Sequence, residues 1–329
     1  MTSFRTIKGL PIKTISGDRT AAAPSSFESQ LYYDSDGVGI FKFIGALAAG
    51  TWASGGALND ARNQCYGAGT QTAAMACGGE SPGVTAATEL YNGSSWTEVN
   101  DLNTARLGHS NTGTQTSAIA AGGLIPNTYQ SIVESWNGTN WTEVADINTA
   151  RGFLGLAGAD NTSAIGFAGQ SPQRALAEVW NGTGWTEVGD LNSARHAVAG
   201  TGSATAAICI GGNPPLTVNT EIWNGTNWTE VNNMNTATAA NAASGIVTAA
   251  LTFGGTPVPG GTGVKTEDWN GTSWTEVNNL STGRNDLGGI PGTSGSSQLA
   301  LAIGGSAPGF TAVTEEWTVA HAIKTVDLS

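Results

Sequence analysis

The chain has 329 residues, of which 12% are charged, and its formal net charge is −12. Nearly all of the acidity lies in residues 49–329, where eight Lys or Arg against twenty-one Asp or Glu give −13; residues 1–48 carry five against four. A surface this acidic is repelled by phosphate backbones and anionic lipid, so we expect neither nucleic-acid binding nor membrane insertion. We interpret the charge as a solubility feature.

Residues 1–48 are expected to form an arm and a β-hairpin. Residues 29–45 alternate around the turn at residues 34–37 (DSDG), a pattern typical of a hairpin. Half of a calcium loop is the alternative, but its remaining ligands and closing Glu are missing. The segment is too short for a core of its own, so we expect it to dock on another protein. Six apolar residues would carry that docking: Phe4, Ile7, Leu10, Ile12, Phe41 and Phe43. No secretory signal is expected.

From residue 49 to residue 319, the chain repeats one unit of about 44 residues. The sequence YNGSSWTEV at 91–99 has near-copies, whose second aromatic positions are Trp96, Trp141, Trp185, Trp228 and Trp274. The steps between them are 45, 44, 43 and 46 residues. Self-similarity at this spacing indicates a repeat architecture that folds as one cooperative array.

Each unit contains four short strand patterns. A polar strand is followed by a small-residue apolar strand that ends in Gly-Gly, then by a Glu-x-aromatic strand and a Trp-Thr-Glu-Val strand. The last two are joined by an Asn-Gly turn, which hairpins favour. Four short strands per unit match one blade of a β-propeller.

The number of units predicts an all-β, six-bladed β-propeller over residues 49–319, with 320–329 as a C-terminal tail. The count includes a fourth-strand pattern at Trp52 and a last third-strand pattern at Trp317. We therefore expect the N-terminal strand near Trp52 to complete the last blade, which removes an open sheet edge. The tryptophans at the repeat positions are expected to pack between blades; a row of exposed, sugar-stacking rings is the alternative.

These units resemble kelch repeats. The resemblance rests on a Gly-Gly pair, an aromatic about a dozen residues later, and a Trp before an Arg-terminated segment, here Gly122-Gly123, Trp136, Trp141 and Arg151. It covers residues 50–319 and implies the propeller fold. It says little about function, because the family includes enzymes, scaffolds and adhesins.

A narrower resemblance concerns the particular amino acids that the repeats contain. WNGTNWTEV, LNTAR and GTQTSAIAAGG are similar to kelch-like proteins of tailed bacteriophages. The N-terminal LPIKTISGD, followed by SQLYYDSDG, looks like the attachment segments of phage tail and virion proteins.

Two sets of recurring polar residues need an interpretation. An arginine closes the Asn-x-Ala-Arg segment of most units, and a glutamate recurs in every third strand. We interpret them as structural ion pairs; a ring of arginines that binds an anion is the alternative. The arginine positions are Arg62, Arg106, Arg151, Arg195 and Arg284, with Thr238 in the remaining unit.

Catalytic and metal-binding chemistry is not expected. The three histidines and three cysteines show no metal-ligand spacing, and the Tyr/Cys/His set of kelch-class radical-copper oxidases finds no match. We therefore predict no enzyme, no metal and no cofactor. Cys65, Cys77 and Cys209 are expected to be small buried hydrophobes, with a Cys65–Cys77 bridge as the alternative.

The loops between second and third strands differ in every unit, and they hold eight of the eleven prolines. They also hold Tyr129, Arg174, Lys265 and Phe310, the candidate binding residues. The alternative is that these loops vary because nothing contacts them.

The expected function is a non-enzymatic structural or adhesion component of a phage virion, made in the host cytoplasm and present in several copies per particle. Residues 1–48 would bind other virion proteins, and the propeller would recognise a host-surface glycan, a host protein or a neighbouring virion protein. A free bacterial propeller that binds carbohydrate or protein is the second hypothesis, and a kelch-type enzyme is the third.

Overall fold

The computed structural model describes residues 50–257, 263–292 and 297–319, together with the backbone of short strands near both termini. The chain divides into two compact units. One contains Met1–Gly50 and Val319–Ser329, and the other contains Thr51–Thr318. No helix long and apolar enough to cross a membrane occurs in the described residues.

The smaller unit combines both ends of the chain. β1 (Thr6–Ile7) pairs with β2 (Leu10–Pro11), and a four-stranded sheet has the order β3-β4-β5-β35. The expected hairpin is confirmed as the antiparallel pair of β4 (Leu31–Asp34) and β5 (Phe41–Ile44). β3 (Lys13–Ile15) lies parallel to β4, and β35 (Ile323–Val326) pairs with β5. The C-terminal residues, expected from sequence to be a tail, thus include a strand of the same sheet.

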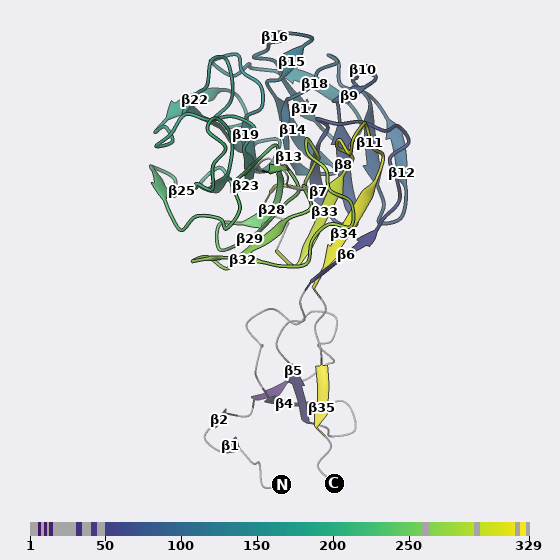
Figure 1. The fold of residues 1–329 in the computed structure, drawn as a ribbon, viewed down its shortest axis with the longest axis vertical. Helices are drawn as coiled ribbons and strands as arrows, with labels where there is room; N and C mark the ends of the chain where they lie inside the picture. Colours follow the sequence, from purple (N-terminus) through teal and green to yellow (C-terminus); the bar gives the residue numbers. More distant parts are fainter. Residues whose placement is uncertain are drawn as a thin grey trace. The chain divides into compact units, whose positions relative to one another are not determined.

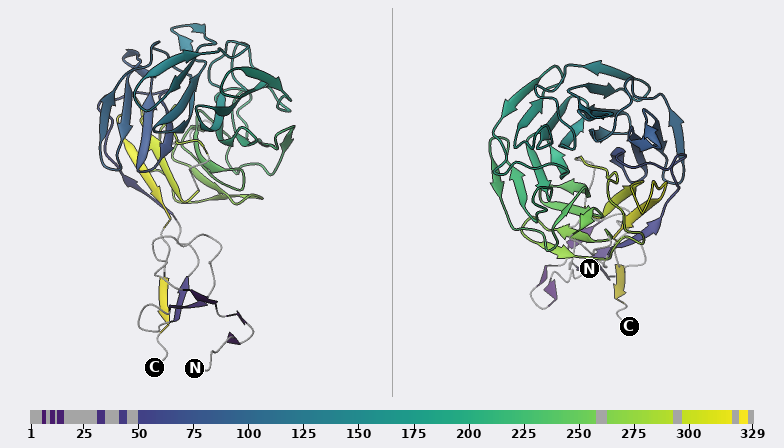
Figure 2. Two further views of the ribbon diagram at one scale, coloured as in Figure 1. Left: turned by 180° about the vertical axis from the view of Figure 1, so that it is seen from behind. Right: turned by 45° about the horizontal axis from the view of Figure 1, so that its top comes forward.

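The larger unit is a six-bladed β-propeller, as predicted (Figure 1). Five blades are four-stranded antiparallel sheets, and all six sheets are arranged around one axis (Figure 2). Blade 1 has β7 (Tyr66–Thr70), β8 (Ala73–Cys77), β11 (Thr88–Tyr91) and β12 (Trp96–Val99). Blade 2 has β13 (Ser110–Thr114), β14 (Ser117–Ala121), β17 (Val133–Trp136) and β18 (Trp141–Val144). Blade 3 has β19 (Gly155–Asp160), β20 (Ser163–Phe167), β21 (Ala177–Trp180) and β22 (Trp185–Val188). Blade 4 has β23 (Ala199–Ser203), β24 (Ala206–Ile210), β25 (Thr220–Trp223) and β26 (Trp228–Glu230). Blade 5 has β28 (Ala242–Ile246), β29 (Ala249–Phe253), β31 (Thr266–Trp269) and β32 (Trp274–Glu276).

Blade 6 is closed by the two ends of the larger unit. Its sheet has the order β33-β34-β6, where β33 is Leu299–Ile303, β34 is Thr314–Thr318 and β6 is Thr51–Ser54. Trp317 lies opposite Trp52, and Thr318 lies opposite Thr51. The predicted closure by the N-terminal strand is therefore confirmed.

Short two-stranded β-ribbons lie in some of the connections between strands. β9 (Glu80–Ser81) pairs with β10 (Gly83–Val84), and β15 (Leu124–Ile125) pairs with β16 (Thr128–Tyr129). β27 (Thr238–Ala239) pairs with β30 (Thr256–Pro257). The first two ribbons lie within the variable loops of blades 1 and 2.

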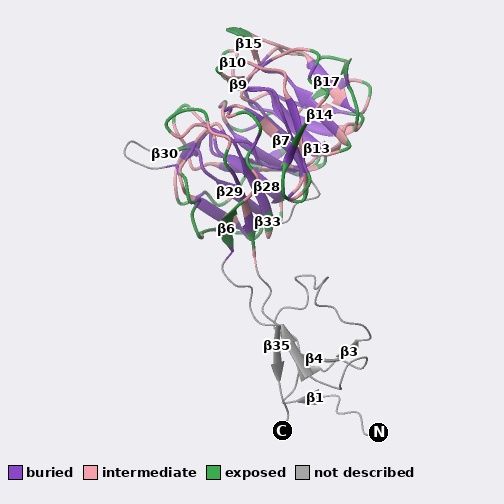
Figure 3. Ribbon diagram, turned by 90° about the vertical axis from the view of Figure 1, so that its right-hand side faces the viewer, coloured by how far each residue is buried: buried purple, intermediate pink, exposed green. Residues whose placement is uncertain are grey.

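The inner strands are buried and rich in small residues (Figure 3). They converge on the axis, so there is little room for side chains. A Cβ at Gly67 in blade 1, for example, would lie 2.3 Å from the carbonyl oxygen of Gly289 in the neighbouring blade. This crowding explains the Ala- and Gly-rich composition of the repeats.

The Gly-Gly pairs join consecutive blades. The second residue of each pair donates its N–H to the carbonyl of the arginine position in the next blade, for example Gly123 to Arg151 at 3.0 Å. The same bond recurs from Gly79 to Arg106, Gly169 to Arg195, Gly212 to Thr238, Gly255 to Arg284 and Gly305 to Arg62. The first residue also comes close to this carbonyl, since a Cβ at Gly122 would lie 2.3 Å from the Arg151 oxygen. The motif therefore marks the contact between blades.

The tryptophans of the outer strands also connect blades. Trp141 Nε1 donates to Thr88 Oγ1 of the preceding blade at 3.1 Å, and Trp274 Nε1 donates to Thr220 Oγ1 at 3.1 Å. Trp228 packs instead against Phe167 of blade 3, with ring centroids 4.8 Å apart. Among the outer-strand rings, Trp96, Trp141, Trp185, Trp228 and Trp274 are buried and Trp52 is half-buried; Trp317, in the third strand of blade 6, is also buried. These rings form packing between blades rather than an exposed row.

Blade 6 departs from the predicted four strands, since its described residues form three. The segment before β33 instead crosses the axis. The Pro291 carbonyl accepts a bond from Thr112 Oγ1 in blade 2 at 3.2 Å, and Gly292 N–H donates to Thr201 Oγ1 in blade 4 at 3.2 Å. Pro291 also forms a β-bridge with Gly245 in blade 5. One segment therefore contacts the inner strands of three other blades.

Candidate functional site

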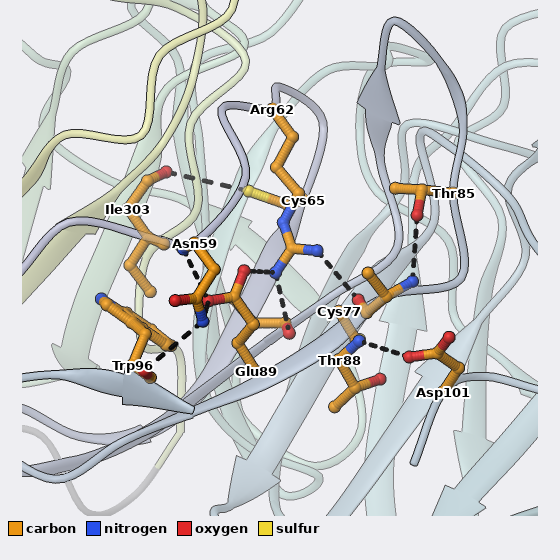
Figure 4. A network of polar contacts seen from close by, with 12 residues as sticks. Asn59, Arg62, Cys65, Cys77, Thr85, Thr88, Glu89, Trp96, Asp101 and Ile303 are labelled. Atoms are coloured by element: carbon orange, nitrogen blue, oxygen red, sulfur yellow. Dashed lines mark hydrogen bonds and ion pairs between the residues drawn. The ribbon is translucent and has the colours of Figure 1, made fainter. Parts of the chain in front are cut away.

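Five blades hold a buried ion pair between the third-strand glutamate and the arginine that precedes the first strand. In blade 1, Arg62 Nη2 lies 2.9 Å from Glu89 Oε1, and Glu89 Oε2 accepts bonds from Asn59 N–H at 2.9 Å and Asn59 Nδ2 at 2.7 Å (Figure 4). The equivalent pairs are Arg106–Glu134, Arg151–Glu178, Arg195–Glu221 and Arg284–Glu315. All ten side chains are at most 2% exposed.

The burial of these arginines decides between the two interpretations of the repeated charges. A buried guanidinium that already has a carboxylate partner cannot bind an anion from solvent without leaving that carboxylate unpaired. The arginines are therefore structural, and they fix the segment between blades against the third strand.

The four candidate binding residues all lie in loops between second and third strands, in four different blades. Tyr129 ends β16 and is half-buried, whereas the Phe310 side chain is 40% exposed. The Arg174 guanidinium donates two bonds to the Ser171 carbonyl of its own loop, at 3.2 and 2.9 Å. Lys265 forms an ion pair with Glu276.

The four residues share one end of the propeller but not one pocket. In the described part of the chain, no hydrogen bond or ion pair joins any two of them. Lys265 lines a pocket beside Glu267, and the other three do not. The arrangement therefore suits contact with a broad surface at several points, rather than enclosure of one small molecule.

The arm residues proposed for docking belong to the smaller unit. Ile7 lies in β1, Leu10 in β2, and Phe41 and Phe43 in β5. Phe4 and Ile12 lie outside the described residues.

A second pocket lies on the propeller axis. Tyr66, Ser110, Asn241 and Pro291 are among its lining residues. Asn241 Nδ2 donates to Thr252 Oγ1 at 2.7 Å, whereas its Oδ1 has no partner among the described protein atoms. The lining carries no charged side chain, so the pocket offers hydrogen bonds but no partner for an ion pair.

The structure brings together a Cys–His pair that the sequence spacing does not indicate. Cys77 Sγ lies 3.5 Å from His109 Nε2, and the Tyr66 and His109 rings have centroids 5.5 Å apart. Cys77 and His109 come from neighbouring blades, so no local motif could have indicated the contact. Within the described ranges, no group of three or more His, Cys, Asp or Glu could hold a metal ion.

Burial keeps this pair neutral. Burial raises the pKa of the Cys77 thiol to about 12, although Arg106 and Arg62 lower it. Burial, together with the same two arginines, holds the pKa of the His109 imidazole well below its usual value. A neutral thiol beside a neutral imidazole is a packing contact, because nucleophilic cysteines require the thiolate. All three thiols are free, so the alternative of a Cys65–Cys77 bridge is wrong.

Comparison with known proteins does not assign the chain to a family. No protein-family model matches the sequence, and no curated protein is significantly similar to it. The structure itself shows a six-bladed β-propeller of small antiparallel sheets.

Proposed function

We propose that this protein is a non-enzymatic recognition component of a tailed-bacteriophage particle. The propeller would be of the kelch type and would present its variable loops to a host-surface glycan or protein, or to a neighbouring virion protein. Residues 1–48 would attach it to the particle. The phage assignment is supported by the resemblance of the repeats and of the N-terminal segment to virion proteins.

The observation that carries the recognition role is the division of each blade into a constant end and a variable end. The Asn-Gly turns barely differ between blades, and each is tied by its asparagine, as where Asn137 Oδ1 accepts bonds from Thr139 and Asn140 N–H at 2.9 Å. The loops at the other end differ in sequence in all six blades, and their lengths vary between blades. Binding residues are typically placed on loops that a rigid scaffold supports.

The points where the chain enters and leaves the propeller support attachment at the constant end. The chain enters the propeller at Thr51 and leaves it at Thr318, where the other blades have their Asn-Gly turns. Attachment through this point uses none of the variable loops.

A matched pair of quadruple variants tests the recognition role. We expect alanine at Tyr129, Arg174, Lys265 and Phe310 together to reduce binding of the protein to host cells or to a virion neighbour at least tenfold. The control replaces the exposed outer-strand residues Thr97, Thr142, Thr186 and Thr229 with alanine and should bind as the wild type does. Unchanged binding of the first variant would refute recognition by this face.

Attachment and phage origin have separate tests. A shortened protein of residues 49–319 should fold but no longer be incorporated into particles, and incorporation at the wild-type level would refute attachment through the terminal unit. Binding of the isolated protein to a glycan array, with no association with particles, would favour a free carbohydrate-binding propeller instead.

A further inference from the structure

Blade 5 lacks the arginine that neutralises the buried glutamate in the other five blades. Thr238 occupies the arginine position, and Glu267 occupies the glutamate position with 2% exposure. The glutamate keeps its other partners, since its carboxylate accepts bonds from Asn235 N–H at 2.8 Å, Asn235 Nδ2 at 2.9 Å and Thr236 N–H at 2.9 Å. Blade 5 therefore preserves the carboxylate side of the ion pair without the cation.

No cation replaces the arginine within the described residues. Glu267 forms no ion pair there, and the undescribed stretch at 258–262 (VPGGT) contains no basic residue. The nearest candidate is Lys265, whose ammonium pairs with Glu276 at the surface, where both side chains are 43% exposed. A buried carboxylate without a counter-charge is costly, so a cation that reaches it gains strong attraction.

A small pocket, about 10 Å³ in volume, lies beside this carboxylate, so a ligand larger than one water molecule requires its lining side chains to move apart. Its lining includes Met234, Thr238, Thr252, Phe253, Lys265 and Glu267. In blade 1, the Arg62 guanidinium occupies the equivalent place and donates to the carbonyls of Ala87 and Ala76, at 3.1 and 3.5 Å. The strand register places Lys265 and Thr252 at the corresponding positions of blade 5. Blade 5 thus retains the acceptors that surround a guanidinium elsewhere.

We propose that the blade 5 pocket binds a guanidinium group supplied from outside the chain. The ligand would pair with Glu267 and donate to the backbone carbonyls of Lys265 and Thr252, the equivalents of those that Arg62 uses in blade 1. A guanidinium is favoured over an ammonium because the retained frame fits a planar donor with several N–H groups. Its source is either a small guanidinium compound or an arginine side chain of a partner protein. This inference goes beyond the proposed recognition role and does not depend on it.

Thermal unfolding of the full-length protein in methylguanidinium chloride tests the proposal, with sodium chloride at equal ionic strength as reference. At a concentration ten times Kd, we expect Tm to rise by about 2 °C. Glu267→Gln should abolish the rise, because it keeps the acceptor oxygen but removes the charge. An equal response of wild type and Glu267→Gln, or no response of wild type, overturns the proposal.

Two further variants keep the test independent of ligand choice. Thr238→Arg supplies the guanidinium from within the chain, so it should raise Tm and remove the response to methylguanidinium. If Thr238→Arg is less stable than wild type, the blade 5 frame does not accept a guanidinium and the proposal fails. Lys265→Ala should keep the response; a response seen only in Lys265→Ala would mean that the lysine occupies the site, which also overturns the proposal.

The two sources are separated by a second probe. N-acetylarginine methylamide carries the same group on a peptide-like backbone. A response to both probes indicates that the pocket admits an arginine side chain of a partner, and a response to methylguanidinium alone indicates a small-molecule ligand.

Discussion

Trp52 and Trp317 face each other across the pairing of β6 with β34, with ring centroids 5.4 Å apart, although they come from opposite ends of the propeller sequence. Trp52 also packs on Phe253 of blade 5, with centroids 4.9 Å apart, and its Nε1 donates to Thr266 Oγ1 at 3.0 Å. One side chain thus connects the first strand of the ring to the last two blades.

Removal of this side chain should weaken the closure of the ring. We expect Trp52→Ala to lower the free energy of unfolding by about 2–3 kcal/mol, because a large, half-buried ring and one hydrogen bond are lost. Urea denaturation measures the change. The control is Thr51→Ala on the same strand, where the exposed side chain should matter by less than about 0.5 kcal/mol. Equal stability of the two variants would contradict closure by Trp52.

The buried ion pairs predict that the stability of the fold depends strongly on keeping both charges of each pair. Arg106→Met leaves Glu134 buried and unpaired, which should cost about 3–5 kcal/mol of stability. The double variant Arg106→Met with Glu134→Gln removes both charges and should recover at least half of that loss. Glu98→Gln, an exposed change on the outer strand of blade 1, should have little effect in the same denaturation experiment. If the double variant is less stable than the single variant, the assigned pairing is wrong.

The close contact between blades at the Gly-Gly motif predicts that a methyl group added there lowers stability, whereas a methyl group added at an open glycine does not. Gly122 has φ +67° and approaches the Arg151 carbonyl, so Gly122→Ala should cost roughly 1–3 kcal/mol. Ala168 stands at the same position of blade 3 with φ +60°, so the variant should still fold. Gly83→Ala adds a methyl group that would meet nothing within 4 Å and should change stability by less than about 0.5 kcal/mol. Equal costs at the two sites would contradict the steric argument.

Asp286 predicts a pH dependence of stability. Burial raises its pKa from 3.8 to about 6, so the folded state holds this proton more tightly than the unfolded chain does. The contribution of Asp286 is therefore most favourable below pH 3.8 and is lost as the pH rises to about 6. At pH 7, Asp286→Asn should stabilise the protein by about 2–3 kcal/mol, and near pH 4 the difference should largely vanish.

Asparagine suits this position in two other ways. It is isosteric with aspartate, and it tolerates the left-handed backbone that Asp286 adopts at φ +53°. Denaturation of wild type and variant at pH 4, 5, 6 and 7 measures the difference. A stabilisation that is the same at all four values would mean that the carboxylate is not the cause.

The sequence predicts most of the propeller because each repeated residue has a local or neighbouring contact to make. Asn-Gly turns, Gly-Gly pairs and the Glu/Arg pairs each recur in five of the six blades, so their spacing gives both the number of blades and the closure at Trp52. The segment that carries Pro291 was not predicted, although there was a signal: proline replaces the glycine found at this position in the other five blades, for example Gly113 and Gly158. Its path across the axis depends on three blades at once, and no local pattern contains that information.

Which residues meet in the candidate sites is harder to predict from the sequence than the fold is. The absence of arginine at Thr238 is visible in the repeat alignment, but the pocket beside Glu267 depends on how strands from one blade pack. The contact between Cys77 and His109 crosses two blades, so it follows from the rotation between them rather than from any motif. The placement of the variable loops at one end does follow from sequence, because the direction of each strand is fixed by its hairpins.

The pairing of Thr51 with Thr318 has a consequence for how such a protein can change over time. The propeller, Thr51–Thr318, is one continuous segment between the two segments of the smaller unit, and its ends pair where a hairpin turn stands in every other blade. Because its two ends are adjacent, the propeller could be inserted into a hairpin of another domain without a change in any blade. The same propeller could therefore be carried by unrelated domains.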